Sequence, residues 1–293
     1  MHSTKSENPT SQNSPNVLKS WLLATRPQTW IASLSPVCIG ASLAPHLHWP
    51  LLLCTLLFAL LLQIGANFAN DYFDFVKGAD TPERKGPARA VQQGWITPKA
   101  MRNATFLILS CALLISLPLI LRAGLWSLLP TALAILSALL YTGGPCPLGY
   151  LGLGELLVLL FFGPVATCGT YYLQTGTWPL TVLLASLPPG LLSCSLLIAN
   201  NLRDEATDRK ANKRTLIVRF GTTFGKWEYT LTLLLASLLP LLFVPTAALI
   251  LFFAFPLIRK VFTYQDPKEL ISVLKKSSLL LFLYTLFFCY AVL

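Results

Sequence analysis

The chain has 293 residues, of which 54% are hydrophobic and 12% are charged, and its mean hydropathy is +0.63. Soluble domains carry roughly 25% charged residues, so this composition excludes an ordinary soluble protein and indicates one that crosses a membrane several times. The net charge of +10 alone would be compatible with nucleic-acid binding, but the distribution of the basic residues along the chain argues against that function.

The first 18 residues are rich in Ser, Asn, Thr and Pro, and they predict a disordered tail (1–18) ahead of one membrane domain (19–293). The membrane domain opens with the sequence TRPQTW at positions 25–30. The interpretation that we favour places Arg26 at lipid headgroups, with Trp21 and Trp30 as interface anchors. The alternative is that Arg26 reaches an anionic ligand.

Nine apolar segments dominate the rest of the chain. A membrane-spanning helix needs about 20 mostly apolar residues, whereas the strands of a membrane barrel alternate apolar and polar residues. The segments show no such alternation, so they predict an all-α, polytopic membrane protein with nine transmembrane helices. They are residues 29–46, 50–70, 103–121, 124–141, 151–173, 180–200, 229–244, 246–262 and 277–293.

Lys and Arg residues gather on one side of this nine-helix arrangement. The N-terminal tail and the second, sixth and eighth gaps hold 21 of the 22, and Arg122 is the exception. The positive-inside rule makes that side cytoplasmic. We therefore expect a multi-pass protein of the cell inner (cytoplasmic) membrane that has its active site toward the cytoplasm and binds no nucleic acid.

Acidic residues concentrate in two stretches, 67–89 and 200–219, which together hold seven of the twelve. In the first stretch, residues four apart share one face of a continuing helix: these are Asn67, Asn70, Asp71 and Asp74. The macrodipole disfavours carboxylates at a helix C-terminus, so they need a compensating cation. Lys77 and Arg84 supply some of that charge, and Mg²⁺ is the other candidate. The alternative interpretation is a polar helix end in water.

The second stretch repeats this geometry. Asn200, Asp204 and Asp208 follow at spacings of four and four, and Lys210 and Arg214 come after them. Both stretches fall on the predicted cytoplasmic side. Two carboxylate faces ringed by cations suit a diphosphate bridged by Mg²⁺, because the metal holds phosphate oxygens while the basic groups take the remaining charge.

Between the two stretches lies a segment rich in glycine and proline, YTGGPCPLGYLGLGE at positions 141–155. This composition predicts a tight connection between two spans. Glu155 is expected about five residues inside the fifth predicted span, and an acid within an apolar span is a functional candidate. The alternative places Glu155 at the interface, paired with a loop arginine.

Together, these three motifs resemble those of the UbiA superfamily of intramembrane prenyltransferases. NDYFDFVKGAD with ERKGPARAV resembles the first aspartate motif of the family, NNLRDEATDRKANKRTL the second, and YTGGPCPLGYLGLGE the connection after the fourth span. The motifs are most similar to the menaquinone branch, and the resemblance covers roughly residues 20–293. Asp80 lies farther along the chain than the third aspartate of the 4-hydroxybenzoate branch, so no role is carried over to it.

The resemblance implies a nine-helix bundle around a central cavity, in which four aspartates hold Mg²⁺ on a polyprenyl diphosphate. Those aspartates are Asp71, Asp74, Asp204 and Asp208, assisted by Asn67, Asn70 and Asn200. The residues that would stabilise the departing diphosphate are Lys77, Arg84, Lys210 and Arg214. Tyr141 would turn its ring toward the allylic cation, and we expect Glu155 beside the aromatic acceptor as a base.

The expected function is transfer of a polyprenyl group from polyprenyl diphosphate to 1,4-dihydroxy-2-naphthoate with loss of the carboxylate, forming demethylmenaquinone in menaquinone biosynthesis. One alternative is a prenyltransferase for another aromatic acceptor, such as a dihydroxynaphthoate isomer or 4-hydroxybenzoate. A second is an ion-coupled transporter. Transporter sites lie near the bilayer midplane, whereas these carboxylates lie at predicted span ends.

Overall fold

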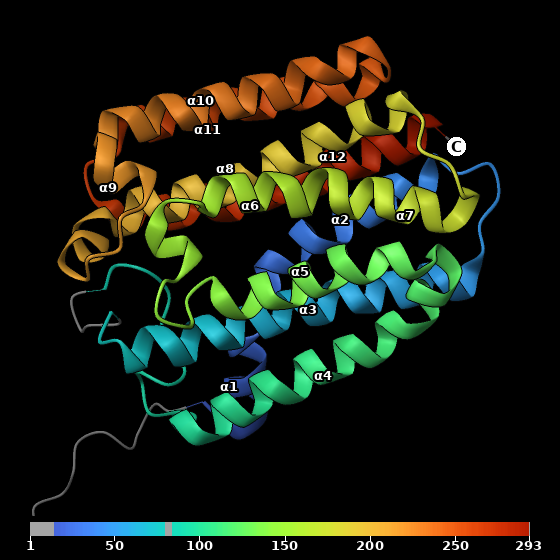
Figure 1. Cartoon of the computed structure of the whole chain (residues 1–293). Coiled ribbons are helices and arrows are strands. Elements are labelled where there is room, and N and C mark those ends of the chain that lie inside the picture. The colour runs from blue at the N-terminus through green and yellow to red at the C-terminus, as the bar shows by residue number, and fades with distance from the viewer. Residues whose placement is uncertain (1–14, 80–83, 293) are drawn as a thin grey trace, which may run out of the picture.

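The computed structural model describes residues 15–79 and 84–292, and the regular secondary structure within these ranges is entirely helical (Figure 1). The α-helices are α1 (Val17–Ala24), α2 (Trp30–Ser42), α3 (Trp49–Val76), α4 (Pro98–Ala123), α5 (Leu128–Leu140), α6 (Gly154–Leu160), α7 (Ala166–Thr175), α8 (Leu180–Lys210), α9 (Leu216–Phe220), α10 (Thr222–Leu238), α11 (Ile250–Thr263) and α12 (Leu270–Val292). Short 3₁₀ turns and one π-helical turn join several of them. Most of the predicted tail (1–18) lies outside the described residues, and α1 begins at Val17.

Six helical segments in the described residues are long and apolar enough to cross a membrane. They are Trp49–Val76, Pro98–Ala123, Gly154–Thr175, Leu180–Lys210, Pro245–Thr263 and Pro267–Val292. Each of the nine predicted spans overlaps a helix, but the first and seventh coincide with α2 and α10, of 13 and 17 residues. The fourth coincides with the shorter apolar helix Leu125–Leu140. The structure therefore agrees with a polytopic helical membrane protein, and six helical segments of its described residues are candidates for full-length spans.

Helices α3 and α8 are longer than a bilayer requires. At 1.5 Å per residue their 28 and 31 residues extend about 42 and 46 Å, beyond the roughly 30 Å of the hydrocarbon core. The additional turns at their C-terminal ends are polar and carry the two aspartate motifs. Both apolar runs therefore continue into helix that projects toward the loops.

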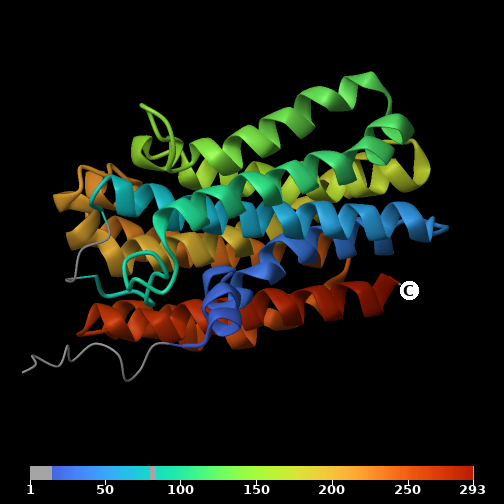
Figure 2. The same ribbon diagram turned by 90° about the horizontal axis from the view of Figure 1, so that it is seen from below.

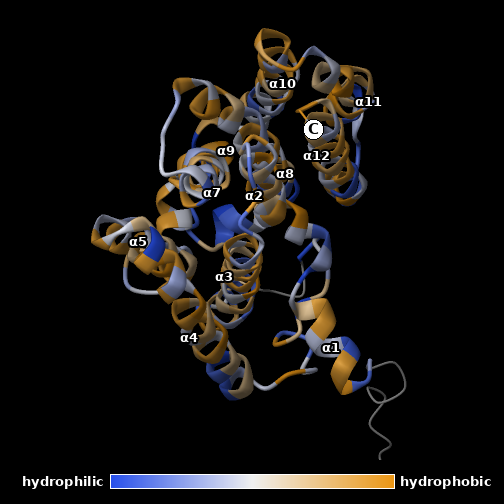
Figure 3. Ribbon diagram, turned by 90° about the vertical axis from the view of Figure 1, so that its right-hand side faces the viewer, coloured by the Kyte–Doolittle hydropathy of each residue, from blue (hydrophilic) through white to orange (hydrophobic). Residues whose placement is uncertain are grey.

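The main hydrophobic core surrounds α8, which packs against α2, α6, α10 and α12. Its largest buried side chains include Tyr229, Tyr284 and Phe288. Hydroxyl pairs cross this core, with Ser35 Oγ 2.6 Å from Thr285 Oγ1 and Tyr229 Oη hydrogen-bonded to a serine of α12. The outer faces of the bundle carry mostly hydrophobic residues (Figure 3), as a lipid-facing surface requires.

Glycines permit close contacts that shape the interior. A Cβ added at Gly40 of α2 would lie 2.3 Å from the carbonyl oxygen of Thr167 in α7. A Cβ at Gly190 of α8 would lie 3.0 Å from Cα of Gly163, within the π-helical turn between α6 and α7. Small residues at such contacts let membrane helices approach backbone to backbone. Gly163 departs from helical backbone angles, so the α6–α7 segment is kinked beside α8.

The loops that follow α3, α5 and α8 meet at one end of the bundle (Figures 1 and 2). Lys77 Nζ donates to the carbonyl oxygen of Thr142 at 2.7 Å, which joins the first two loops. The backbone N–H of Arg214 donates to the carbonyl oxygen of Tyr150 at 3.0 Å, which joins the last two. The ends of the two aspartate-bearing helices are thereby brought together.

Candidate active site

A cavity of about 550 Å³ lies inside the bundle, between α2, α3, α5, α8 and the kinked α6–α7 segment. Near the joined loops it is lined by charged side chains, namely Asp74, Arg84, Arg89, Arg203 and Lys213. Toward the opposite end it is lined by apolar and aromatic ones, including Phe58, Leu119, Trp126 and Tyr172. The cavity therefore has one ionic end and a long apolar interior.

The two aspartates of the first motif have different surroundings, although both are buried. Asp74 lines the cavity, accepts a hydrogen bond from Tyr150 Oη at 3.0 Å and lies 3.4 Å from a guanidinium nitrogen of Arg89. The Asp71 carboxylate accepts two backbone hydrogen bonds instead, from Ala90 at 3.0 Å and Val91 at 3.2 Å. Asp71 is absent from the cavity lining of the described residues.

A helix turns 100° per residue, so Asp71 lies about 60° around α3 from Asp74. The hydrogen bonds from Ala90 and Val91 hold Asp71 toward the loop that follows α3, away from the cavity. The predicted common face is therefore confirmed for Asn67, Asn70 and Asp74, which all line the cavity, and wrong for Asp71.

The aspartates of the second motif are paired with basic side chains that separate them from the cavity. Two guanidinium nitrogens of Arg203 donate to the Asp204 carboxylate, Nε to Oδ1 at 2.8 Å and Nη2 to Oδ2 at 2.6 Å. A guanidinium nitrogen of Arg84 lies 3.6 Å from Asp204 Oδ2. Lys213 Nζ lies 3.4 Å from Asp208 Oδ1. These three cations line the cavity, whereas the two carboxylates are covered by them.

Lys213 shows that the two motifs share one electrostatic environment. Burial lowers the pKa of its ammonium group, but the nearby carboxylates of Asp208, Asp74 and Asp204 outweigh that effect and raise the pKa. The first of these carboxylates belongs to the second motif and the next to the first. Asp208 likewise lies within electrostatic reach of Asp204 and Asp74.

The carboxylates suit a metal that is shared with a ligand. In the part of the chain that the structure describes, no group of three or more His, Cys, Asp or Glu side chains forms a ready metal site. Asp208 Oδ2, however, is buried and has no hydrogen-bond partner among the described residues. Mg²⁺ commonly takes one or two carboxylates plus substrate phosphate oxygens. The aspartates therefore fit Mg²⁺ that arrives with a phosphate-bearing molecule.

The predicted cations are only partly brought to this site. Arg84 lines the cavity. Lys77 is exposed along most of its side chain, and its ammonium group donates to backbone carbonyls of the next loop. Partial burial of that ammonium group lowers its pKa. Lys210 and Arg214 are exposed, and Arg214 lines a separate surface hollow with Arg209 and Arg219. Placing Lys77, Lys210 and Arg214 at the cavity was therefore wrong. Arg89, Arg203 and Lys213 occupy that place.

The chain reversal after α8 explains why Lys213, and not Lys210, lies beside Asp208. Asn212 has a left-handed backbone conformation, with φ of 54°, directly after the helix end at Ala211. Asparagine tolerates this conformation better than most residues. The reversal turns Lys213 back onto Asp208, while Lys210 remains on the outer surface.

The three predicted asparagines line the cavity and are held by neighbouring groups. Asn70 Oδ1 accepts from Thr142 Oγ1 at 2.9 Å, and Asn200 Oδ1 accepts from Arg203. Asn67 Nδ2 donates to the Thr25 carbonyl oxygen at 2.9 Å. Their first role is thus to fix the walls of the ionic end.

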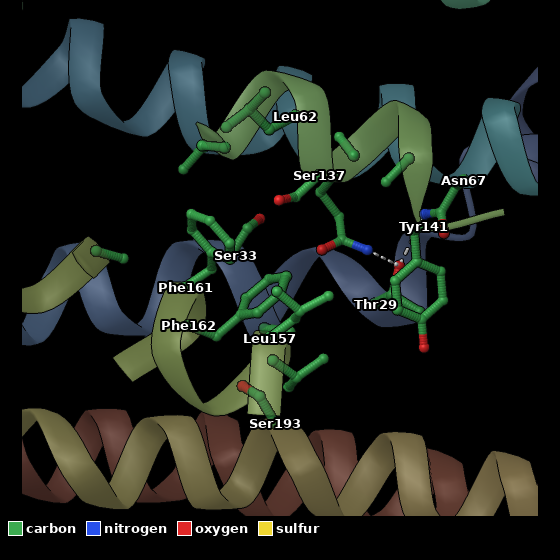
Figure 4. Close-up of a pocket in the computed structure, with 18 of the residues that line it drawn as sticks. Thr29, Ser33, Leu62, Asn67, Ser137, Tyr141, Leu157, Phe161, Phe162 and Ser193 are labelled. Atoms are coloured by element: carbon green, nitrogen blue, oxygen red, sulfur yellow. Dashed lines mark hydrogen bonds between the residues drawn. The ribbon is translucent and has the colours of Figure 1, made fainter. Parts of the chain in front are cut away.

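Tyr141 lies at the end of α5 and turns its ring into the cavity near Asn67 and Thr29 (Figure 4). Glu155 lies in the first turn of α6, because that helix begins at Gly154, so the predicted depth of about five residues was wrong. Its Oε1 accepts from Asn201 Nδ2 at 2.8 Å. Among the described residues Asn201 lines the cavity and Glu155 does not.

The segment before α2 contributes to the cavity, a role that the sequence indicated only under the less favoured interpretation of Arg26. Arg26 lines the cavity, and one of its guanidinium nitrogens donates to the Asn67 carbonyl oxygen at 3.4 Å. The favoured placement of Arg26 at lipid headgroups was therefore wrong. Trp21 packs on Phe68, with ring centroids 5.5 Å apart, which anchors α1 against α3. Asp80 and Glu83 lie outside the described residues.

An apolar cavity in a helical membrane bundle, with carboxylates and cations at one end, defines an enzyme that handles a long apolar chain with an anionic head. The sequence model of the UbiA prenyltransferase family matches residues 33–291, and the chain belongs to that family. It is a membrane-embedded prenyltransferase.

Two relatives and one solved structure illustrate the similarity. The chain is 41% identical over 222 residues to the 1,4-dihydroxy-2-naphthoate octaprenyltransferase of Mycobacterium tuberculosis, covering 75% of this chain and 76% of the relative. It is 37% identical over 295 residues to the enzyme of the same name from Haemophilus influenzae, covering 92% and 94%. The structure of a UbiA homologue from Archaeoglobus fulgidus bound to DMAPP and Mg²⁺ matches with a TM-score of 0.56 at 15% identity, covering 92% of this chain and 99% of that one, which establishes the shared fold.

Proposed function

We propose that this protein transfers a polyprenyl group from polyprenyl diphosphate to 1,4-dihydroxy-2-naphthoate, with loss of the carboxylate, and so forms demethylmenaquinol, the reduced form of demethylmenaquinone, in menaquinone biosynthesis. The names of the bacterial relatives support this acceptor and a polyprenyl donor. The observation that carries the proposal is that cations paired with Asp74, Asp204 and Asp208 line the ionic end of an otherwise apolar cavity, and that all three carboxylates lie within electrostatic reach of Lys213.

The ionic end suits the diphosphate head of the donor. Asp74, Asp204 and Asp208 would hold Mg²⁺ together with phosphate oxygens, and the metal would neutralise charge on the leaving diphosphate. Arg84, Arg89, Arg203 and Lys213 line the same space and take the remaining charge through hydrogen bonds that strengthen as the diphosphate departs. Asp71 is assigned to holding the loop at Ala90 and Val91.

The apolar interior suits the reacting carbon and the prenyl chain. When the allylic C–O bond breaks, its electron pair leaves with the diphosphate, and an electron-rich ring carbon of the naphthoate attacks the allylic carbon. Residues such as Phe161 and Phe162 keep water from that carbon, and the ring of Tyr141 stabilises developing positive charge. The new C–C bond replaces the bond to the carboxylate, which leaves as CO₂.

We further propose that all nine predicted segments cross the inner (cytoplasmic) membrane and that the ionic end faces the cytoplasm. The packing of α2 and α10 around α8 supports their inclusion among the spans. The concentration of 21 of 22 Lys and Arg residues on one side of the nine-span arrangement supports the orientation.

The acceptor is tested with purified protein in lipid nanodiscs, given Mg²⁺, a polyprenyl diphosphate and one acceptor at a time. The acceptors are 1,4-dihydroxy-2-naphthoate, a dihydroxynaphthoate isomer and 4-hydroxybenzoate, with products identified by mass spectrometry. We expect turnover with the first, giving a product that has gained the prenyl group and lost CO₂. Turnover restricted to 4-hydroxybenzoate, or a product that keeps the carboxylate, would contradict the proposal.

A further inference from the structure

A polar clip joins the turn before α2 to helix α3. Its members are Thr29, Gln63 and Asn67, and all three line the cavity. Gln63 Nε2 lies 3.2 Å from Thr29 Oγ1, and Asn67 Nδ2 lies 3.0 Å from the same oxygen. Figure 4 shows Thr29 and Asn67 beside the ring of Tyr141.

The single proton of the Thr29 hydroxyl fixes the orientation of both amides. Thr29 Oγ1 donates that proton to the Arg26 carbonyl oxygen at 2.9 Å, so toward the amides it acts only as an acceptor. Gln63 must therefore present its N–H to Thr29 and its carbonyl oxygen to the other side. That oxygen, Gln63 Oε1, is buried and has no hydrogen-bond partner within the described chain.

A buried carbonyl oxygen without a donor is unfavourable, because it has lost its water and gained no replacement. Gln63 lines the cavity, so a ligand in the cavity can supply the missing N–H or O–H. A diphosphate bound to metal has only acceptor oxygens to offer. The ligand that satisfies Gln63 is therefore a donor, such as a phenolic hydroxyl.

Arg26 supplies a cation beside this clip. Its backbone is left-handed, with φ of 51° and ψ of 68°, which is uncommon for a residue other than glycine and is found at sites that orient a side chain for function. Its guanidinium reaches the Asn67 carbonyl oxygen. Asn67 precedes Asp74 by seven residues of α3, about 10 Å along the helix. Arg26 also lies within electrostatic reach of Asp71, so it borders the ionic end from the side of Gln63.

We propose that Arg26 and Gln63 form the binding site for the aromatic acceptor. The Arg26 guanidinium binds the acceptor carboxylate, and Gln63 Oε1 accepts a hydrogen bond from a ring hydroxyl. This inference rests on the proposed function, since it takes the acceptor to be a hydroxylated naphthoate. A carboxylate inside an apolar cavity requires a cation, and Arg26 is the cavity-lining cation that contacts α3 at Asn67, about one helical turn from Gln63.

The chemistry of the acceptor indicates which ring hydroxyl donates a hydrogen bond to Gln63. In 1,4-dihydroxy-2-naphthoate the hydroxyl at position 1 is adjacent to the carboxylate and donates to it within the molecule. The hydroxyl at position 4 keeps a proton for an outside acceptor. Gln63 is therefore assigned to the hydroxyl at position 4, and the pair of contacts fixes the ring in one orientation beneath the allylic carbon.

The test measures inhibition constants against 1,4-dihydroxy-2-naphthoate, on protein already shown to turn over that acceptor. The inhibitors are 4-hydroxy-2-naphthoate, 2-naphthoate, which lacks the hydroxyl, and 1-naphthol, which lacks the carboxylate. Arg26→Gln should weaken both acids at least tenfold and leave 1-naphthol unchanged. Gln63→Leu should weaken 4-hydroxy-2-naphthoate and 1-naphthol several-fold and leave 2-naphthoate unchanged.

Two controls separate ligand recognition from local structure. Thr29→Val removes the acceptor that orients the Gln63 amide but keeps the Gln63 oxygen, so it should weaken 4-hydroxy-2-naphthoate and 1-naphthol less than Gln63→Leu does and leave 2-naphthoate unchanged. The KM for polyprenyl diphosphate should change less than twofold in both Arg26→Gln and Gln63→Leu. Equal weakening of all three inhibitors, or an effect of Arg26→Gln on the donor KM alone, would overturn the proposal.

A measurement on the unaltered protein keeps the proposal testable if a variant fails to fold. The comparison is between 4-hydroxy-2-naphthoate and 6-hydroxy-2-naphthoate, which have the same charge and differ in the ring that carries the hydroxyl. We expect at least tenfold tighter binding of the first. Equal inhibition constants would refute the assignment of Gln63, while absence of turnover with 1,4-dihydroxy-2-naphthoate would refute the proposed function itself.

Discussion

Asp71 and Asp74 belong to one sequence motif, yet their side chains make different contacts. Asp74 faces the cavity and its cations, whereas both oxygens of Asp71 receive backbone N–H groups from the following loop. The same distinction applies to the cations, since Lys213 faces Asp208 and Lys210 faces outward. A shared motif therefore contains both residues that face the cavity and residues that hold a loop or face outward.

Replacing an aspartate at the ionic end of the cavity should impair the chemical step. Asp74→Asn and Asp208→Asn each remove a negative oxygen from the metal–diphosphate site, whose interactions strengthen as the leaving group takes charge. We expect kcat to fall roughly 10²-fold or more. The matched control is Glu205→Gln, in the same motif but paired with Arg209 at the surface. Near-normal kcat in both aspartate variants, measured by product formation at saturating substrates, would place the carboxylates away from the reaction.

Replacing Asp71 should act on the loop. In Asp71→Asn an amide –NH₂ group replaces one acceptor oxygen, leaving a buried backbone N–H of Ala90 or Val91 unpaired at a cost of about 1–3 kcal/mol. We expect a lower unfolding temperature in detergent and faster proteolysis within residues 84–97, with an unchanged Mg²⁺ concentration for half-maximal rate. A raised Mg²⁺ requirement with an intact loop would instead identify Asp71 as a metal ligand.

The sequence predicted the face of each helix better than the partners of each side chain. Helical spacing correctly grouped Asn67, Asn70 and Asp74, which follow one another at intervals of three and four, because the helix repeat is a local property. It did not reveal Lys213, which reaches Asp208 through a left-handed turn at Asn212, nor Arg26, which arrives from another segment. Contacts made across the bundle depend on packing that one sequence does not display.

At the level of helices, apolar runs in the sequence predicted where the spans lie. They did not predict that a helix such as α3 continues through polar residues beyond its span. The α3 helix extends six residues beyond its predicted limit at residue 70, because its motif keeps helical spacing. The first span was predicted over 29–46, but α2 covers only Trp30–Ser42 and lies against α7 at Gly40. Such close contacts define the cavity wall and carry no signature in hydropathy.

The contact between α2 and α7 is tested by adding volume at its centre. Gly40→Val places a side chain against the Thr167 carbonyl oxygen, and overpacking of this kind costs about 1–3 kcal/mol. We expect a clear fall in the unfolding temperature in detergent. The matched control is Gly169→Ala in α7, where an added Cβ meets nothing within 4 Å. Equal stability of both variants would show that α2 and α7 are farther apart.

The side on which each loop lies is tested with single cysteines in a cysteine-free background. Ala79→Cys after α3 and Ala211→Cys after α8 should react with a membrane-impermeant maleimide only from the cytoplasm. Thr177→Cys, between α7 and α8 at the other end, should react only from outside. Labelling of the first two from opposite faces would mean that the two aspartate motifs cannot share one site.

At the scale of the whole molecule, charge and hydropathy are distributed to serve a substrate with an ionic head and an apolar tail. Composition alone predicted an all-helical membrane protein, and the positions of seven of the twelve acidic residues predicted two motifs acting together. The structure adds that these motifs meet at one end of an apolar cavity, with cations between the carboxylates and the open space. That arrangement requires an incoming metal–diphosphate to engage groups that are otherwise paired with each other.

The most direct test of this account is the dependence of turnover on Mg²⁺. Purified protein in nanodiscs is treated with EDTA, supplied with polyprenyl diphosphate and 1,4-dihydroxy-2-naphthoate, and titrated with Mg²⁺ while prenylated product is quantified by mass spectrometry. The account predicts background rates in EDTA and full recovery on adding Mg²⁺, because the metal is what would let the carboxylates of Asp74, Asp204 and Asp208 hold the phosphate oxygens and would neutralise the leaving diphosphate. Full turnover in EDTA would contradict it.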